Sequence, residues 1–404
     1  MDTKLARRTS LPADSIDSSG YPLAFLVEKG ARRPGVLGGG PARDLFVAET
    51  RQFGGHQKEA VVREGDSGSR WRIVSDEGKH LGGSDLAPFP LGYFNAGLHA
   101  DLGGRITALA AERGLALGAL QMDVKTRYSL TGSFTRGDAV GTAEPVTIEI
   151  EIDSPAVGAD IGRLVGDTLS TSPAIAALRT PLTNTFAIYV NGRRRSVTTL
   201  AASAAADAAN PFRTHARPPA PLDGARTLER IVHRTGEVRE GEISPAPAEV
   251  TARTIRVITG NSRFPGLNGI AEVDTYLSLP GVSHFAIKAD ERPAGDEAPC
   301  GLSHITAGIV FCYMTQISRY IEHMKLDIGG TRIVQVAPYS LGGGSGQGGR
   351  AEPVDTHLFF NGEEGDEMHE KLMLIAARTC YLHATLAAAL EPEVSVIHNG
   401  KALD

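Results

Sequence analysis

The sequence has few of the residues that hold small secreted domains together, and no apolar run long enough to cross a membrane. Its 404 residues include only three cysteines. So few cysteines exclude a disulfide framework, and we expect any role they have to be that of free thiols. Nowhere do about 18 uncharged apolar residues follow one another, and no apolar segment follows the arginines Arg7 and Arg8 near the N-terminus. These absences predict a cytoplasmic protein without a membrane partner.

Clustered positive charge is also missing. The formal net charge is −6, and the lysines and arginines are scattered along the chain. Binding to a phosphate backbone needs a basic patch or stripe, so nucleic acid is not an expected partner. The length and the 41% hydrophobic content are those of two or three ordinary globular domains.

What the sequence does contain is an internal similarity. Residues 84–101 read SDLAPFPLGYFNAGLHAD, and residues 296–312 read DEAPCGLSHITAGIVFC. Similar residues keep their order over about a hundred positions, which predicts a duplication. With an offset of 211 and then 208 residues, the matched pairs are Asp85 and Asp296, Ala87 and Ala298, Pro88 and Pro299, Gly97 and Gly308, Tyr128 and Tyr339, Leu164 and Leu372, Leu178 and Leu386, and Asn191 and Asn399.

Each copy has the pattern of an α+β unit. A D-x-A-P segment precedes a helical pattern, alternating strands follow, and a second helical segment leads to a closing strand. The predicted helices are 89–113, 157–179, 300–325 and 365–390, and the strands include 147–153, 186–190, 356–360 and 394–398. The predicted organisation is an extension over 1–45, a first domain over 46–199, an Ala/Pro-rich linker over 200–245 and a second domain over 246–404.

Two glycine-rich segments interrupt this pattern. Residues 35–41 and 342–349 are predicted to be a surface-draped stretch and a mobile loop. The P-loop pattern G-x-x-x-x-G-K-[ST] does not occur, so we do not predict a phosphate site in either segment.

Cys312 and Cys380 allow two interpretations. Each could be a small buried hydrophobe, a common role of free cysteine. However, their matched positions in the first copy are Asp101 and Ser172. Because a purely apolar site should not become a carboxylate in the other copy, we favour a shared polar pocket in which the two thiols meet. Cys300, at the expected N-terminus of its helix, is predicted to be a spectator thiol, although a helix N-terminus lowers a thiol pKa.

The motif around the central helix resembles that of the OsmC/Ohr superfamily, the osmotically inducible and organic hydroperoxide resistance proteins. Cys312 lies thirteen residues after Pro299, and the first copy has Ala87-Pro88-Phe89-Pro90 with Asp101 at the same spacing. The resemblance implies an α+β fold of two OsmC-like domains in tandem, each a curved antiparallel sheet packed on a long central helix. The family's homodimer would become an intramolecular pseudo-dimer, and further homo-oligomers remain open.

The resemblance also implies thiol-dependent reduction of organic hydroperoxides. Cys312 would attack the peroxide, Cys380 would resolve the product as a disulfide, and a dithiol would reduce that disulfide without any cofactor. In the family an arginine and a glutamate hold the thiolate. The arginine candidates come from the first-copy strands and are Arg63, Arg70 and Arg72.

The glutamate of the family is missing, because Ser303 and Gly92 occupy its two positions. This departure leaves two alternatives. One is a cysteine enzyme acting on another electrophile, such as a carbon–sulfur compound. The other is a non-catalytic protein that binds a small ligand in the pocket of Asp101.

Two histidines lie near the motif. His304 follows Ser303 and could line the pocket or only cap the helix. His383, one turn after Cys380, could join Cys312 and Cys380 as a third metal ligand, but C-x-x-H is a common spacing and we predict no metal site.

Overall fold

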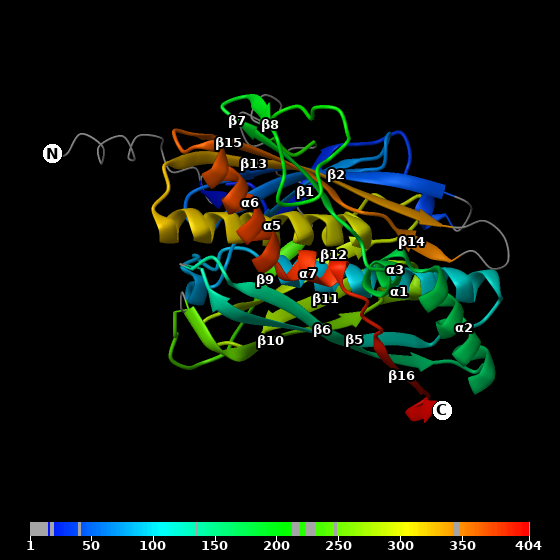
Figure 1. Ribbon diagram of the computed structural model, residues 1–404. Helices are drawn as coiled ribbons and strands as arrows, with labels where there is room; N and C mark the ends of the chain where they lie inside the picture. Colours follow the sequence, from blue (N-terminus) through cyan, green and yellow to red (C-terminus); the bar gives the residue numbers. More distant parts are fainter. Residues whose placement is uncertain are drawn as a thin grey trace.

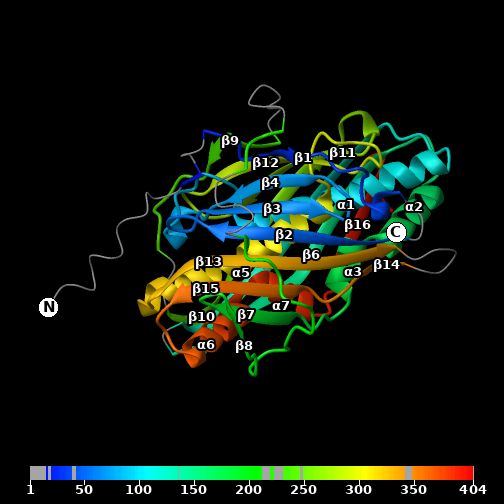
Figure 2. The same ribbon diagram turned by 90° about the horizontal axis from the view of Figure 1, so that it is seen from above.

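The computed structural model describes residues 15–16, 20–38, 42–134, 136–211, 219–222, 231–245, 249–341 and 348–403. The fold is α+β. Two β-sheets enclose two long helices, α1 (Pro90–Glu112) and α5 (Gly301–Met324), so that α5 lies under one sheet and α1 over the other (Figure 1). Figure 2 shows the first sheet spread across the molecule above α5.

The first sheet combines strands from distant parts of the chain. Its order is β1-β4-β3-β2-β13-β15-β7-β8, with β14 paired to β13. The bounds are β1 Ala24–Glu28, β2 Ala42–Gln52, β3 Lys58–Glu64, β4 Arg70–Ser75, β7 Thr185–Val190, β8 Arg193–Arg195, β13 Ile328–Leu341, β14 Gly349–Ala351 and β15 Asp355–Gly362.

The second sheet has the order β9-β12-β11-β10-β5-β6-β16-β17. The bounds are β5 Ala119–Ser133, β6 Val140–Asp153, β9 Val232–Val238, β10 Glu249–Arg263, β11 Ile270–Leu277, β12 Ser283–Asp290, β16 Glu393–His398 and β17 Lys401–Leu403.

The two sheets follow one plan with the halves of the chain exchanged. In the first sheet β13 and β15 lie between β2 and β7, and in the second sheet β5 and β6 lie between β10 and β16. Each sheet therefore contains strands from both 46–199 and 246–404. The expected all-antiparallel pairing needs one correction, because β15 pairs with β7, and β16 with β6, in parallel.

Strand β6 shows how the sequence pattern forms the core. Ile148, Ile150 and Ile152 are buried, whereas Glu149 and Glu151 between them are exposed. This alternation gives the strand one apolar face, and burial of a side chain such as isoleucine contributes about 1.5–3 kcal/mol.

Helices α1 and α5 cross at very short range. A Cβ atom added to Gly97 would lie 2.5 Å from the carbonyl oxygen of Gly301, and one added to Gly308 would lie 2.9 Å from that of Pro90. Only glycine leaves room for this approach. The matched Ala-Gly pairs of the two sequence copies thus place the central helices in contact.

The second helical segment of each copy is not continuous, contrary to the prediction. The first divides into α2 (Gly158–Thr171) and α3 (Pro173–Arg179), and the second into α6 (Asp366–Thr379) and α7 (Tyr381–Ala387). Ser172 and Cys380 have extended backbones at the two breaks, with ψ of 117° and 112°. Pro173 disfavours helix at Ser172. Cys380, which no proline follows, caps α7 with its own sulfur.

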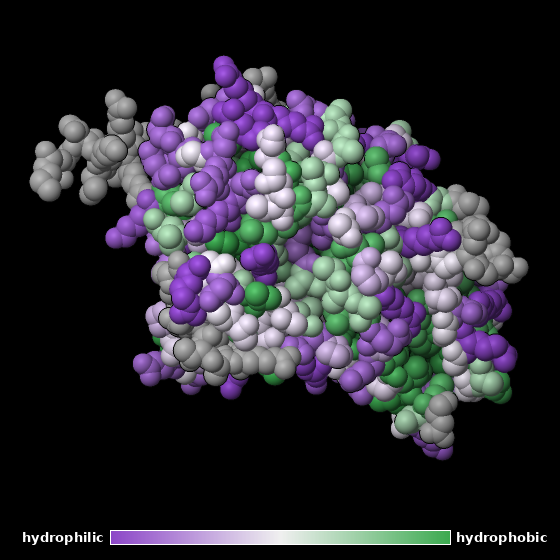
Figure 3. Space-filling model, viewed as in Figure 1, coloured by the Kyte–Doolittle hydropathy of each residue, from purple (hydrophilic) through white to green (hydrophobic). Residues whose placement is uncertain are grey.

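Parts of the predicted extension and linker belong to the sheets. Strand β1 of the predicted extension pairs with β4, and β9 of the predicted linker pairs with β12. Residues 1–14, 17–19, 39–41, 212–218, 223–230, 246–248 and 342–347 lie outside the described residues, and with them most of the predicted loop 342–349. In the part of the chain that is described, no helix is both long and apolar enough to span a membrane. Hydrophilic side chains cover much of the upper part of the face in Figure 3.

Candidate functional site

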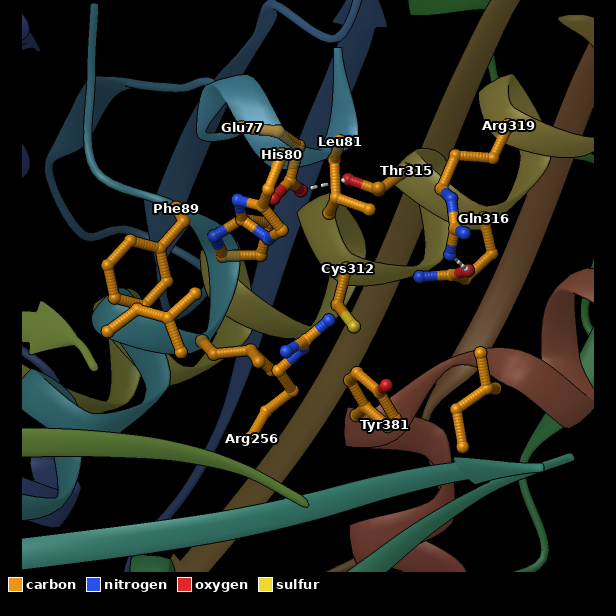
Figure 4. A pocket seen from close by; sticks show the side chains of 14 residues that line it. Glu77, His80, Leu81, Phe89, Arg256, Cys312, Thr315, Gln316, Arg319 and Tyr381 are labelled. Carbon is orange, nitrogen blue, oxygen red and sulfur yellow. Dashed lines mark hydrogen bonds between the residues drawn. The ribbon is translucent and has the colours of Figure 1, made fainter. Parts of the chain in front are cut away.

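Cys312 lies in the wall of a cavity of about 80 Å³ between α5, the start of α1 and the second sheet. One part of the lining is apolar and the other is polar. The apolar residues are Leu81, Phe89, Pro90, Leu91, Leu130 and Leu277, and the polar residues beside Cys312 are Glu77, His80, Arg256, Thr315, Gln316, Arg319 and Tyr381. Figure 4 shows the Cys312 side chain pointing into this space, toward Arg256 and Tyr381.

Two arginines bring positive charge to the sulfur. Arg256 comes from β10, and Arg319 lies two turns after Cys312 on α5. The Arg319 guanidinium lies 4.3 Å from the centre of the Phe134 ring and donates a 3.1 Å hydrogen bond to Gln316 Oε1. Burial lowers the Arg319 pKa, and the neighbouring Tyr381, Glu77 and Cys312 oppose that effect. Guanidinium stays charged in proteins, so two positive charges line the cavity of Cys312 together with the Glu77 carboxylate.

A buried charge network fixes the carboxylate of Glu77. Thr315, one turn after Cys312, donates a 2.5 Å hydrogen bond to Glu77 Oε1. The fully buried Lys58 ammonium lies 3.4 Å from the same oxygen and donates 2.7 Å hydrogen bonds to Thr315 Oγ1 and the His56 carbonyl. A buried ion pair needs such extra hydrogen bonds to offset its desolvation.

His80 adds a neutral group to the cavity. It lies in a short 3₁₀ turn, Lys79–Leu81, and is 8% exposed. Burial, and then the positive charges of Arg256 and Arg319, lower its pKa to about 4. Its imidazole is therefore uncharged at neutral pH.

Cys380 lies directly behind Cys312 and is fully buried. Burial raises the pKa of the Cys380 thiol well above its ordinary value, and the neighbouring Cys312 raises it further. The His383 backbone N–H donates to Cys380 Sγ at 3.5 Å, and His383 Nδ1 lies 3.2 Å from the same sulfur. Cys380 is thus a protonated thiol that lies near Cys312 and contacts an imidazole.

Cys300, Ser303 and His304 lie elsewhere, and none of them lines the Cys312 cavity. Glu64 Oε1 accepts hydrogen bonds of 2.8 Å from both the Cys300 N–H and the Ser303 hydroxyl. Burial, and then Glu64 and Glu291, raise the Cys300 pKa, so the expected effect of the helix N-terminus is outweighed. His304 contacts the Lys288 carbonyl through Nε2 at 3.0 Å and stacks on Tyr93.

The three arginines named from the sequence do not line the cavity either. Arg72 is buried against Glu59 at 2.6 Å, Arg63 lies 3.6 Å from Asp66, and Arg70 lies 3.4 Å from Glu28. The structure instead places Arg256 and Arg319 there. No local motif marks either residue in the sequence, and Arg319 could have been found only from its two-turn spacing after Cys312.

Asp101 and Ser172 also meet. The Ser172 hydroxyl donates a hydrogen bond to Asp101 Oδ2, and Arg105 Nε donates to Asp101 Oδ1 at 2.9 Å. Beside them lies a second cavity of about 260 Å³, whose lining includes Arg105 and Glu291. Burial, and then the charge of Asp101, raise the Glu291 pKa to about 8.

In the described part of the chain, no three or more His, Cys, Asp and Glu side chains are grouped so as to hold a metal ion. The geometry therefore gives no support to Cys312, Cys380 and His383 as a ligand set.

Comparison with known proteins yields little. No family model matches the sequence. No curated protein matches it either. Among solved structures, the chain is similar to an OsmC-like hydroperoxide resistance protein from Jannaschia sp. CCS1, at 19% identity over 36% of this chain and 95% of that chain, with a TM-score of 0.25. A similarity of this size assigns neither fold nor activity.

Proposed function

We propose that this chain reduces organic hydroperoxides with Cys312 as the nucleophile and Cys380 as the resolving cysteine. The observation that carries the proposal is the proximity of the two thiols, of which Cys312 lines a cavity together with two arginines and Cys380 is fully buried. This arrangement suits a peroxidatic thiol, because the reacting sulfur must be accessible as a thiolate and a second thiol must be within reach. The motif resemblance described above gives hydroperoxide as the substrate class.

In the first step the Cys312 thiolate attacks the distal oxygen of the peroxide. A sulfur–oxygen bond forms, the O–O bond breaks, and the leaving alkoxide takes up a proton to become an alcohol. Arg256 and Arg319 supply the positive charge that favours the thiolate and stabilises negative charge on the leaving oxygen. Glu77, held by Thr315 and Lys58, takes the role of the acidic residue that the helix motif lacks.

In the second step Cys380 attacks the sulfenic acid at Cys312. A disulfide forms and the oxygen leaves as water. A dithiol then reduces the disulfide by thiol–disulfide exchange and is itself oxidised to a disulfide. The chain thus returns to its two free thiols, the state in which both cysteines are found.

The apolar side of the cavity indicates which peroxides fit. Leu81, Leu91 and Leu277 line it together with the Phe89 ring. These side chains can contact an alkyl or aryl group while the arginines bind the peroxide oxygens. We therefore propose that organic hydroperoxides are better substrates than hydrogen peroxide.

The architecture is consistent with a duplicated origin. We infer that the two sequence copies, 46–199 and 246–404, are OsmC-like units that form an intramolecular pseudo-dimer. The shared strand order of the two sheets and the close crossing of α1 and α5 support this inference. In it, the copy with Cys312 and Cys380 is active and the copy with Asp101 and Ser172 has lost its chemistry.

Mass spectrometry of the whole chain tests the proposal. After one equivalent of cumene hydroperoxide, we expect a Cys312–Cys380 disulfide and one molecule of alcohol per chain, with Cys300 unmodified. Hydrogen peroxide at the same concentration should react more slowly. Unchanged thiols, or oxidation at Cys300 alone, would contradict the proposed function. Reaction of Cys312 with an alkylating reagent but with no peroxide would favour an enzyme for another electrophile.

A further inference from the structure

We infer that the His383 imidazole is the catalytic base that takes the proton from the Cys380 thiol when Cys380 attacks oxidised Cys312. This inference rests on the proposed function, since it concerns the second step of that reaction. The resolving sulfur must be a thiolate to attack, yet it is fully buried. A base in contact with it is therefore needed.

His383 has the geometry of such a base. Its Nδ1 lies 3.2 Å from Cys380 Sγ, which is hydrogen-bond distance for sulfur. The His383 backbone N–H also points to that sulfur at 3.5 Å and can stabilise the thiolate as it forms. The ring is stacked on Phe186, with centroids 5.6 Å apart, and is tilted against Tyr313 at 4.7 Å. These rings fix the orientation of Nδ1 toward the sulfur.

The surroundings also set the protonation states. Burial lowers the His383 pKa to about 4, so the imidazole is neutral at neutral pH. Because it is a weaker base than the buried thiolate, it takes the proton as the sulfur–sulfur bond forms. Other titratable groups near the two residues are Cys312, Tyr128 and Tyr313. Burial raises the pKa of both tyrosines well above ordinary values, so they stay protonated over the working range.

The first copy of the chain provides an internal comparison. Ser172 caps α3 as Cys380 caps α7, and Ile175 occupies the place of His383. The Ile175 N–H donates to Ser172 Oγ at 3.0 Å, in the way that the His383 N–H points to Cys380. The fold thus accepts an isoleucine three residues after the capping residue. The imidazole occurs only in the copy that has the thiol.

The step balances without any additional reactant. As the Cys380 sulfur attacks the Cys312 sulfur of the sulfenic acid, its proton moves to His383 Nδ1. The new bond joins the two sulfurs and the sulfur–oxygen bond breaks. The leaving hydroxide takes a proton from the His383 imidazolium and departs as water, which returns the imidazole to its neutral form.

Two variants of the whole chain test the base, His383→Ile and His383→Asn. His383→Ile introduces the residue found at the matched position of the first copy, and His383→Asn keeps a polar side chain without basicity. Rapid mixing with cumene hydroperoxide, followed by acid quench and mass spectrometry, separates alcohol release in the first step from disulfide formation in the second. His369→Gln is the matched control, because His369 is a fully buried histidine on α6 that contacts the Gly365 carbonyl and neither thiol.

We expect both His383 variants to release alcohol at the wild-type rate and to form the disulfide roughly 100-fold more slowly, a typical loss for a missing general base. In the variants, disulfide formation should accelerate about tenfold per pH unit, because the thiol must then ionise without help. Wild-type disulfide rates in both variants would overturn the inference. Equal slowing of both steps would also overturn it, by showing a structural role. A wild-type chain that releases no alcohol would instead refute the proposed function itself.

Discussion

Ser172 donates a hydrogen bond to Asp101 at the place in the first half of the chain that Cys380 and Cys312 occupy in the second half. In both halves one residue of the pair, Ser172 or Cys380, caps a short helix through its own side chain. The other residue, Asp101 or Cys312, lies on the central helix of its half. The same backbone arrangement therefore brings together an acid and a hydroxyl in one half and two thiols in the other.

The two cysteines should have separable roles. We expect Cys312→Ser to abolish hydroperoxide turnover and to leave the fold nearly unchanged, because the replacement is close in size and removes only the reacting sulfur. Cys380→Ser should release one equivalent of alcohol and then stop, with a sulfenic acid at Cys312 that dimedone labels. Cys300→Ser, which changes a thiol outside the cavity, is the control and should turn over as the wild type does. Sustained turnover in Cys312→Ser would rule out its role as nucleophile.

The arginines of the cavity should control the reactivity of Cys312. In Arg319→Met and Arg256→Met, loss of a nearby cation disfavours the thiolate. We expect alkylation of Cys312 by iodoacetamide at neutral pH to slow by about tenfold in each variant. A tenfold change corresponds to a free-energy difference of about 1.4 kcal/mol. Arg113→Met is the matched control, because Arg113 pairs with Asp167 on the surface. Equal rates in all three variants would show that neither cavity arginine activates the sulfur.

The sequence predicted the paired positions better than their surroundings. Matching of the two copies identified Asp101 and Ser172 as the counterparts of Cys312 and Cys380, because similar residues follow in the same order at a nearly constant offset in both copies. It also predicted the helices that contain Asp101 and Cys312, since both are long and mostly apolar. The break at Cys380 was missed, because no proline follows that residue and its sulfur forms the cap.

The charged residues of the cavity could not be predicted from the sequence either, and the reason is a different one. Glu77 follows a strand and Arg256 lies within one, and both are far from Cys312 in the sequence. Glu77 follows β4 of the first sheet, and Arg256 lies in β10 of the second sheet. The two residues reach the cavity of Cys312 only because the two sheets enclose α5 (Figure 1). Lys58 is the extreme case, since its polar sequence context suggests a surface residue and its side chain is fully buried.

The matched geometry of the two halves predicts that a thiol pair can be built in the first half. We expect Asp101→Cys combined with Ser172→Cys, in a Cys312→Ser background, to form a new disulfide with diamide. Closing this loop should stabilise the oxidised chain over its reduced form by about 2–4 kcal/mol. Urea unfolding of both forms measures the difference, with Asp101→Cys alone as the control. If the two new cysteines stay reduced, the halves are not equivalent at these positions.

Glu291 should make stability fall as the solution becomes alkaline. Burial, and then the nearby Asp101, raise its pKa to about 8, while the Gly301 N–H donates to its carboxylate. Because the folded chain then binds more protons than the unfolded chain between about pH 4.5 and pH 8, the free energy of unfolding decreases as the pH rises through that window. The buried His80 and His383 have lowered pKa values, so they contribute little to the slope above about pH 7. The buried thiols of Cys300 and Cys380, whose pKa values are raised, also make stability fall as the pH approaches about 8.5, so comparison with a Glu291 variant is needed to separate the carboxyl group from them.

The variant Glu291→Gln keeps the acceptor for Gly301 and removes the titration. We expect the free energy of unfolding of the wild type, from urea titrations, to fall between about pH 7 and pH 8.5, with Glu291 contributing up to about 1.4 kcal/mol per pH unit, and that of Glu291→Gln to fall less steeply. The two proteins should therefore differ most at the alkaline end, where the variant is the more stable. Glu112→Gln, which changes an exposed carboxylate lining the same cavity, should keep the wild-type slope. Parallel slopes in the wild type and Glu291→Gln would mean that Glu291 is already ionised at neutral pH, and that the charges of Arg33 and Arg105 outweigh its burial.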